Sequence, residues 1–334
     1  MKISADGGSL CQPANGNFTF TKNFLKAISL YDIQNQYDVY TFCSLKKNNE
    51  FNKNITFRKL RPKLGWMKIR VGMEEIFNSK EIFLALNQAS PLFGQNKIIS
   101  FCHGLSYYYF PNYYKKNELS RLNSQLRQMV NKSDEIVVSS IKIEKELVSV
   151  FPNLKNIVVI PYGIPFDVVQ NEQITKRERS ILALGYGQPI KNIDFIIRTF
   201  KKLQEDKKYS DYRLYLIGKK NDKKKEKNII VINNIKRQDL LKLYSNSALL
   251  LTTSFYESYN FPVIEALASG CNVVGLKSAI IPEMEKYVEL ANNEGKFVDK
   301  IKESLSNPEK ISYDSLKEEF SWVNYINKLK KLYI

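Results

Sequence analysis

The segment SFYESYNFPVIEALASGCNVVG, residues 254–275, contains the pattern that decides the fold. The apolar run ALLLTTS (248–254) leads into it and predicts a strand. A short helix is expected over 262–268, because Pro262 suits the first turn of a helix. The run CNVVGL (271–276) then predicts a second strand. A strand, a loop, a helix and a strand in this order are typical of an α/β protein with a parallel sheet.

Two glutamates stand eight positions apart in this segment. Glu257 lies in the loop after the first strand, and Glu265 is expected in the first turn of the helix. Ligands of open α/β sheets collect at the carboxyl ends of the strands, and helix N-termini attract phosphate groups. A carboxylate at such a place can accept hydrogen bonds from the hydroxyls of a ribose or a hexose. The segment therefore predicts a binding site for both ends of a nucleotide sugar.

The same alternation of apolar runs and helical periodicity continues through the chain of 334 residues. Further strands are expected at 1–5, 37–42, 55–60, 81–86, 97–102, 135–140, 156–161, 180–187, 212–218 and 228–233, and further helices at 18–30, 119–132, 141–150, 192–203, 237–245 and 321–332. Periodicity is lost and charge rises over 163–179, which predicts a domain boundary. We expect an α/β domain over 1–165, a second over 166–318 and a terminal segment over 319–334.

The letters around the two glutamates resemble the Glu-x7-Glu motif of the retaining family-4 glycosyltransferases. That family has the GT-B fold, in which two Rossmann-like domains with parallel sheets face each other across a cleft. The run FPVIEALASG (261–270) and the later IPE (281–283) match its pattern. The resemblance implies that Glu265 binds the ribose of the donor nucleotide and that Glu257 lies at the transferred sugar. It also implies that the backbone between them contacts the sugar and its diphosphate, at Ser258, Tyr259, Asn260 and Phe261.

The stretch GYGQPIKNIDFIIRTFKKL (185–203) resembles the strand, loop and helix with which the family binds the donor phosphates. Lys191 falls on the family's lysine, and an ammonium group there would neutralise charge on the leaving diphosphate. The family usually has an arginine in this loop as well, whereas this chain has Tyr186 and Ile190. The sequence leaves two alternatives open: the loop binds the donor phosphates more weakly, or Lys219 takes the place of the missing arginine.

The first half of the chain has a histidine loop, FCHGLSYYYFP (101–111), which resembles that of mannosyltransferase-like members of the family. His103 is the single histidine of the chain, and an imidazole can donate to sugar hydroxyls and stabilise charge near the reacting carbon. The resemblance implies three catalytic residues, His103, Glu257 and Lys191. It also implies donor-site glycines at Gly8, Gly16 and Gly187. The run FSWVNYINKL (320–329) resembles the last helix of the family, which crosses back to the first domain.

By this resemblance the chain transfers a hexose, with mannose as one option, from a UDP- or GDP-linked donor. The acceptor would be a glycan or a lipid-linked glycan, in the synthesis of cell-surface polysaccharide or glycolipid. The family transfers with retention at the anomeric carbon, and it needs no metal ion or other cofactor. In agreement, no Asp-x-Asp pair stands at a predicted strand end.

The formal net charge of +17 favours an anionic partner, although biased genome composition is an equal alternative. Residues 53–70 hold seven basic and no acidic side chains, interleaved with Leu60, Leu64, Trp66 and Met67. This pattern suggests peripheral contact with an anionic membrane, and the alternative is an ordinary basic strand and loop. No apolar run is long enough to cross a bilayer, and the N-terminus lacks a signal-peptide core. We therefore expect a cytoplasmic protein, and both a soluble protein and one attached peripherally to the inner face of the membrane remain open.

The four cysteines stand apart in the sequence, at Cys11, Cys43, Cys102 and Cys271. Their spacing contains no Cys-x-x-Cys pair, and with one histidine in the chain a zinc site is excluded. The sequence therefore predicts four isolated, buried thiols.

Two other classes of function remain as alternatives. A nucleic-acid-binding protein would gather its basic residues with aromatic residues on one module, whereas here they are spread over both halves, so no nucleic-acid partner is expected. A catalytically silent GT-B scaffold is the other alternative, and the missing arginine in the loop 185–191 supports it.

Overall fold

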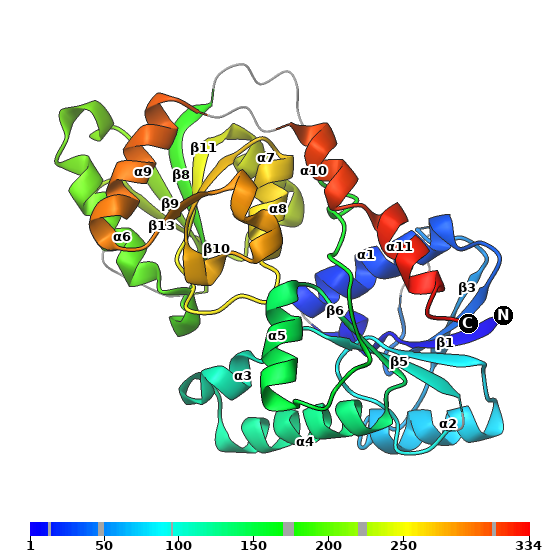
Figure 1. The fold of residues 1–334 in the computed structure, drawn as a ribbon. Helices are drawn as coiled ribbons and strands as arrows, with labels where there is room; N and C mark the ends of the chain where they lie inside the picture. The colour runs from blue at the N-terminus through cyan, green and yellow to red at the C-terminus, as the bar shows by residue number, and fades with distance from the viewer. Residues whose placement is uncertain (13–14, 46–49, 95, 170–176, 220–225, 309–311) are drawn as a thin grey trace. The chain divides into compact units, whose positions relative to one another are not determined.

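A computed structural model of the chain describes residues 1–12, 15–45, 50–94, 96–169, 177–219, 226–308 and 312–334. The chain forms two compact units (Figure 1). Unit 1 comprises Met1–Gly163 and Phe320–Ile334, and unit 2 comprises Ile164–Glu319. Part of the predicted boundary segment, residues 170–176, lies outside the described residues.

Unit 1 is built on a seven-stranded sheet with the strand order β3-β2-β1-β4-β5-β6-β7, in which all neighbouring strands are parallel. Its strands are β1 (Lys2–Asp6), β2 (Gln36–Thr41), β3 (Ile55–Lys59), β4 (Ile82–Ala85), β5 (Lys97–Cys102), β6 (Glu135–Val138) and β7 (Ile157–Val159). Its helices are α1 (Gly16–Tyr31), α2 (Gly72–Phe77), α3 (Ser106–Tyr109), α4 (Lys116–Lys132), α5 (Ile141–Val150) and α11 (Trp322–Lys330). The central strands are buried along their length, as expected for a parallel sheet covered on both faces.

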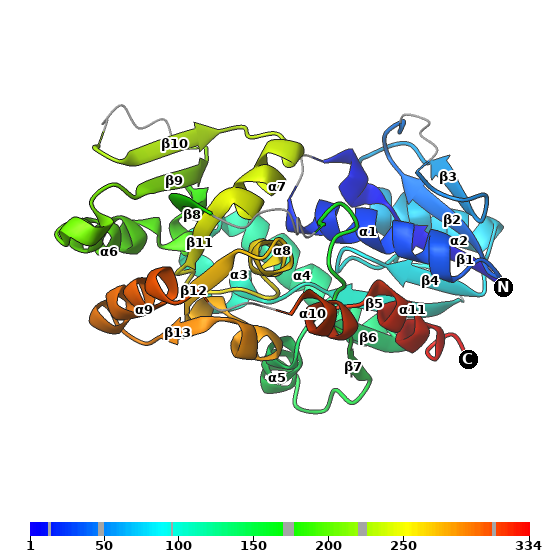
Figure 2. The same ribbon diagram turned by 90° about the horizontal axis from the view of Figure 1, so that it is seen from above.

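Unit 2 has a six-stranded parallel sheet in the order β10-β9-β8-β11-β12-β13. Its strands are β8 (Glu178–Tyr186), β9 (Arg213–Gly218), β10 (Ile229–Asn233), β11 (Ser247–Thr252), β12 (Asn272–Leu276) and β13 (Glu289–Ala291). Its helices are α6 (Ile193–Gln204), α7 (Arg237–Asn246), α8 (Phe261–Ala268), α9 (Glu294–Ser306) and α10 (Tyr313–Glu319). Helices α6 and α9 contact each other over one core, and α7 and α8 contact each other (Figure 2). Because the strands are parallel, their carboxyl ends meet at one edge. The predicted fold class, two α/β halves with parallel sheets, is confirmed.

The C-terminal segment returns to unit 1, where α11 packs beside α1 (Figures 1 and 2). The ring of Tyr325 lies 6.4 Å from that of Phe20 and 6.1 Å from that of Phe24, measured between centroids. Trp322 covers Gly163, where an added Cβ atom would come within 2.4 Å of the indole. Glycine at this position therefore lets the last helix close over the end of the unit.

The cysteine prediction is wrong for one pair. Cys11 and Cys43 form a disulfide with a Cα–Cα distance of 5.6 Å, whereas Cys102 and Cys271 are free and buried. The two bonded cysteines are 32 residues apart, but each follows the carboxyl end of its strand. Since β1 and β2 are parallel neighbours, the fold brings the two ends together.

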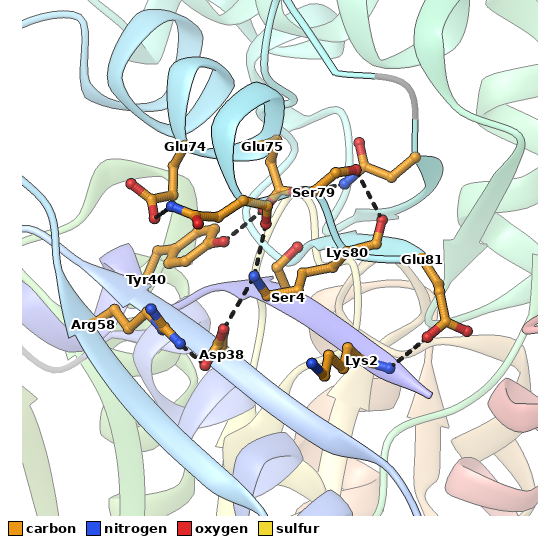
Figure 3. A network of polar contacts seen from close by, with 12 residues as sticks. Lys2, Ser4, Asp38, Tyr40, Arg58, Glu74, Glu75, Ser79, Lys80 and Glu81 are labelled. Atoms are coloured by element: carbon orange, nitrogen blue, oxygen red, sulfur yellow. Dashed lines mark hydrogen bonds and ion pairs between the residues drawn. The ribbon is translucent and has the colours of Figure 1, made fainter.

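Helix α2 points a carboxylate toward the protein interior and apolar side chains toward solvent. Glu75 is fully buried and accepts a hydrogen bond of 2.7 Å from the Tyr40 hydroxyl and another from the Asn96 amide (Figure 3). Burial raises the pKa of Glu75, and these hydrogen bonds oppose the rise. Met73, Ile76 and Phe77 of the same helix are exposed. This arrangement is the reverse of the usual amphipathic helix.

The apolar residues of the basic segment 53–70 do not share one environment. Leu60 and Trp66 are buried in a core cluster of unit 1, and Met67 packs against that cluster. Leu64 is exposed. The predicted interleaving of basic and apolar side chains on one surface is therefore wrong for three of its four apolar residues. Across the described ranges, no helix combines the length and apolar composition that a membrane-spanning helix needs.

Candidate functional site

The loops after β8 and β11 hold most of the predicted donor residues, and backbone contacts join them. Gly187 follows β8 with φ of 92°, a left-handed conformation that favours glycine. The Phe255 N–H donates to the Ile190 carbonyl at 2.9 Å. The Thr253 hydroxyl donates to the Asn192 carbonyl at 3.0 Å. These bonds fasten the two loops to each other at the carboxyl edge of the sheet of unit 2.

Lys191 and Glu257 form an ion pair between these loops. The Lys191 Nζ lies 2.5 Å from the Glu257 Oε1, and the Ser254 hydroxyl donates to the same oxygen at 2.6 Å. The side chains of Lys191 and Glu257 are 23% and 12% exposed, so solvent reaches both. The structure thus brings together the ammonium group predicted at the diphosphate and the carboxylate predicted at the sugar.

Glu265 lies one residue further into its helix than the sequence predicts, just past the first turn. Helix α8 begins at Phe261 because Asn260, with φ of 68°, turns the chain just before it. Glu265 is therefore the fifth residue of α8, and the first turn carries no acidic residue. Its position on the helix turns the carboxylate toward α7 and away from the free N–H groups at the start of α8.

An arginine covers the Glu265 carboxylate. Glu265 is only 3% exposed, and its Oε1 lies 2.8 Å from Nη1 of Arg237. Nε and Nη2 of Arg237 donate to the two carboxylate oxygens of Asp167 at 2.8 and 2.9 Å. Burial raises the pKa of Glu265, and the hydrogen bond and charge of Arg237 oppose the rise. Arg237 therefore helps keep Glu265 ionised.

The residues between the two glutamates differ in exposure. Ser258 and Phe261 are partly exposed, whereas Tyr259 and Asn260 are buried. The Asn260 amide donates to the Ala279 carbonyl at 2.9 Å. The Tyr259 ring lies 5.0 Å from the Phe261 ring. The side chains of Tyr259 and Asn260 therefore stabilise the loop itself.

In unit 1, both ring nitrogens of His103 have protein partners. Nδ1 lies 2.7 Å from the Tyr162 hydroxyl, and Nε2 lies 2.5 Å from the Leu86 carbonyl. A carbonyl only accepts, so Nε2 carries the proton and Nδ1 accepts from Tyr162. Burial lowers the pKa of His103 to about 4. The imidazole is therefore neutral at physiological pH, and this geometry does not provide the charge stabilisation that the sequence suggested.

The two donor-site glycines of unit 1 have different environments. A Cβ atom at Gly8 would lie 3.0 Å from both Asp6 and Trp66, whereas among the residues that the structure describes none comes within 4 Å of one at Gly16. The Gly8 N–H donates to Asp6 at 2.8 Å, and the Asn87 amide donates to the same carboxylate at 2.7 Å. A side chain at Gly8 would thus press against Asp6 and Trp66, and the described residues show no such constraint at Gly16.

The sequence analysis missed Arg237, Asp167 and Asp6. Arg237 opens a helix directly after a predicted strand, and Asp6 directly follows the first one, so strand-end position was a usable signal for both. Asp167 gave no such signal, because it lies in the segment where periodicity is lost. At the positions of the missing arginine, Tyr186 is buried and Ile190 is partly buried. Lys219 is exposed, and its N–H donates to the Tyr186 carbonyl at 2.9 Å.

Comparison with known sequences finds a match in unit 2. Residues 167–319 match the family described as glycosyl transferases group 1. A probable sucrose-phosphate synthase of Thermosipho melanesiensis is 27% identical over 232 residues, which cover 58% of this chain and 54% of that protein. An MMP alpha-(1->4)-mannosyltransferase of Mycolicibacterium hassiacum is 21% identical over 136 residues, 38% of this chain and 32% of that protein. The matches thus span about half or less of these relatives' lengths.

Solved structures resemble the whole chain in fold. Sucrose-phosphate synthase from Thermosynechococcus elongatus superposes with a TM-score of 0.74 at 13% identity, covering 100% of this chain and 98% of that one. Anabaena HepE in complex with UDP and glucose gives 0.71 at 12% identity, covering 99% of both chains. Trehalose-6-phosphate from E. coli bound with UDP-2-fluoro glucose superposes with a TM-score of 0.69 at 10% identity, covering 100% of this chain and 99% of that one.

The family match coincides with the unit that carries Lys191, Glu257 and Glu265, and the structural matches extend over both units. Both agree with the resemblance drawn from residues 254–275. The chain therefore carries a glycosyl transferases group 1 domain in residues 167–319 and has the GT-B fold.

Proposed function

We propose that this protein is a retaining glycosyltransferase that moves a hexose from a nucleotide-diphosphate sugar to a glycan or a lipid-linked glycan. The observation that carries the proposal is the contact of 2.5 Å between Lys191 and Glu257 at the carboxyl edge of the sheet in unit 2. A cation for the diphosphate and a carboxylate for sugar hydroxyls stand there side by side. The family match of this unit supports the same activity.

In the proposed reaction, the bond from the anomeric carbon to the diphosphate breaks while the acceptor hydroxyl attacks from the same face. The acceptor's proton passes to the leaving diphosphate oxygen. The Lys191 ammonium neutralises negative charge that develops on the diphosphate, and this stabilises the transition state. Glu257 orients the sugar, and Glu265 accepts hydrogen bonds from the ribose hydroxyls. The proposed reaction uses no metal ion or other cofactor.

Two observations bear on the donor, and they favour different sugars. Two of the structurally similar proteins hold UDP or a UDP-sugar, which favours a UDP-linked donor. One relative in sequence is a mannosyltransferase, and the histidine loop at 101–111 resembles that of mannosyltransferase-like enzymes. UDP-hexoses and GDP-mannose are therefore the first donors to test.

A thermal-shift screen of the purified protein against UDP- and GDP-sugars tests the donor proposal. The donor should raise the melting temperature of the wild type, because a ligand at 100 times its Kd stabilises the folded state by about 2.7 kcal/mol. Glu265→Ala should lose the shift, and Glu294→Ala should keep it, since Glu294 forms exposed ion pairs with Lys202 and Arg198. Absence of a shift with every donor would contradict the proposal.

Transfer itself is tested with the donor found in that screen and a panel of glycan and lipid-linked acceptors. NMR of the product should show the anomeric configuration of the donor. Donor binding without transfer to any acceptor would favour the catalytically silent scaffold.

We also propose that unit 1 contacts an anionic membrane at the cytoplasmic face, where a lipid-linked acceptor would be found. Helix α2 and its flanks expose a set of apolar side chains: Leu64 (91% exposed), Ile69, Met73, Ile76, Phe77 (76%), Leu92 and Phe93. Leu92 donates its N–H to the Lys68 carbonyl and Phe93 lies against Gly72, so these two residues adjoin the segment that carries Ile69 and Met73. The basic residues Arg61 and Lys63 are exposed in the same segment. Apolar side chains beside cations suit an anionic bilayer surface.

Co-sedimentation with vesicles of phosphatidylcholine alone or mixed with phosphatidylglycerol tests the membrane proposal. The wild type should bind the anionic vesicles more strongly. The double variant Leu64→Ser, Phe77→Ser should bind at least about tenfold more weakly. The reason is that burial of each side chain contributes about 1 kcal/mol or more to binding. Ile33→Ser, a change at another exposed apolar residue of unit 1, should bind as the wild type does. Equal binding of all three proteins would refute the proposal.

A further inference from the structure

We infer that Arg237 is a positioning residue of the donor site, which Asp167 holds in place and which keeps Glu265 ionised and oriented for the ribose of the nucleotide. This inference rests on the proposed function, because it assigns a role to the residues around the proposed ribose-binding carboxylate. Arg237 itself is not proposed to touch the sugar or the diphosphate.

The geometry of the guanidinium group is the first argument. Arg237 is the first residue of α7 and follows β10, so it lies at the carboxyl edge of the sheet where ligands collect. Two of its nitrogens hold both oxygens of Asp167, and the third lies 2.8 Å from Glu265. A planar guanidinium fixed at two points cannot turn away from the third. Asp167 thus fixes the direction from which Glu265 is held.

The burial of Glu265 is the second argument. At 3% exposure the carboxylate has little contact with water, so its charge depends on protein groups. The titratable groups that act on it are Arg237 and Tyr244 of α7 and Asp167. Asp167 and burial favour the protonated form, whereas Arg237 makes the largest opposing contribution. Without Arg237, Glu265 would be protonated at a higher pH and would lose part of its capacity to accept from two ribose hydroxyls.

The remaining hydrogen-bond acceptor capacity of the Glu265 carboxylate is the third argument. Arg237 occupies Oε1, and a carboxylate oxygen has two lone pairs, so a hydrogen bond from Arg237 leaves acceptor sites on both oxygens. The side chain of Arg237 is 36% exposed and forms the solvent-facing side of the pair. Acceptor sites for the ribose hydroxyls therefore remain on the carboxylate while the ion pair persists.

Titration calorimetry with UDP and GDP at pH values from 5.5 to 8.5 tests this role in the full-length protein. The variants are Arg237→Met, Arg237→Lys and Asp167→Asn. The control is Arg179→Met, because Arg179 forms an exposed ion pair with Asp211 in the same unit. For the nucleotide that the wild type binds, Arg237→Met should raise the Kd about tenfold or more at pH 7. The loss should shrink as the pH rises, since alkali ionises Glu265 again.

Arg237→Lys should restore part of the affinity. Lysine supplies the positive charge, but it lacks the planar guanidinium group that donates two hydrogen bonds to Asp167. Asp167→Asn should weaken binding by a smaller factor, and the control should match the wild type. A Kd and pH profile equal to the wild type in Arg237→Met would overturn the inference, as would a loss that is the same at every pH. If Arg237→Met fails to fold, the profiles of Arg237→Lys and Asp167→Asn decide in the same way.

Failure of the proposed function has a different signature. In that case the wild type binds neither nucleotide, or Glu265→Ala binds as tightly as the wild type does. Wild-type binding that is lost in Glu265→Ala, together with an unchanged Arg237→Met, would leave the proposed function intact and reject the role of Arg237 alone.

Discussion

At the scale of single residues, the partners of a side chain decide which chemistry it can perform. The resemblance of the histidine loop, together with a place after a predicted strand, implied a catalytic role for His103, and this residue does follow β5 directly. Its imidazole donates to the Leu86 carbonyl and accepts from the Tyr162 hydroxyl, 59 residues away. Burial keeps the imidazole neutral, and its two partners fix which nitrogen carries the proton. No pattern near residue 103 could indicate either.

The first prediction concerns the pH dependence of stability. The pKa of His103 is lowered from its ordinary 6.5 to about 4, so the unfolded chain binds a proton more readily than the folded one. This histidine therefore stabilises the fold above pH 6.5, and its contribution is lost as the pH falls toward about 4. Urea unfolding between pH 4 and 8 should show a smaller decrease in acid for His103→Gln than for the wild type. Identical pH dependence in the two proteins would contradict this assignment.

At the scale of the element, one arginine joins the ends of two helices. Arg177 donates to the carbonyls of Tyr244, Ser245 and Ser247 at the end of α7, and to that of Ser269 after α8. The last carbonyls of a helix have no partner within it, and a cation there also suits the helix dipole. Arg177 thereby fixes the carboxyl ends of α7 and α8, whose other ends carry Arg237 and the loop of Glu257.

The second prediction follows from these contacts. Arg177→Ala should lower the free energy of unfolding by about 2–4 kcal/mol, because four carbonyls lose a charged donor. Arg179→Ala, at an exposed position two residues along β8, should cost about 1 kcal/mol or less. Chemical denaturation followed by far-ultraviolet circular dichroism measures both. Equal losses in the two variants would mean that Arg177 does not stabilise the helix ends.

The sequence of helix α2 does not indicate which of its sides is buried. Its sequence, GMEEIF, mixes apolar and acidic residues and was not predicted as a helix. The buried side of α2 is set by Tyr40 and Asn96, which together satisfy the Glu75 carboxylate. Tyr40 lies on β2 and Asn96 directly precedes β5, so the exposure of Ile76 and Phe77 follows from the fold.

At the scale of the whole molecule, the chain leaves unit 1 after Gly163 and returns to it at Phe320. The returning segment fills part of the core of unit 1 with Phe320, Trp322, Tyr325, Ile326 and Leu329, all buried. The stability of unit 1 thus depends on the last residues of the chain, which are synthesised after unit 2.

The third prediction tests this dependence. Trp322→Ala should destabilise unit 1 by about 3–5 kcal/mol, the range for removing a large aromatic side chain from a core. Val323→Ala, at an exposed neighbour on α11, should change stability by about 0.5 kcal/mol or less. The two tryptophans of the chain, Trp66 and Trp322, both belong to unit 1, so the fluorescence of Trp66 follows this unit in either variant. An unfolding curve unchanged in Trp322→Ala would refute the dependence.

The sequence by itself determined the two α/β halves, the strand–loop–helix around Glu257 and Glu265, and the loop with Lys191 after β8. These features are local, because hydrophobic period, turn residues and motif spacing all act over a few residues. Tertiary structure alone decided the disulfide between Cys11 and Cys43, the neutral state of His103 and the hold of Arg237 and Asp167 on Glu265. Each of these joins residues from separate elements, and sequence spacing carries no record of which strand ends and helices become neighbours. Burial and partner distance, which set charge and reactivity, exist only once the sheets have formed.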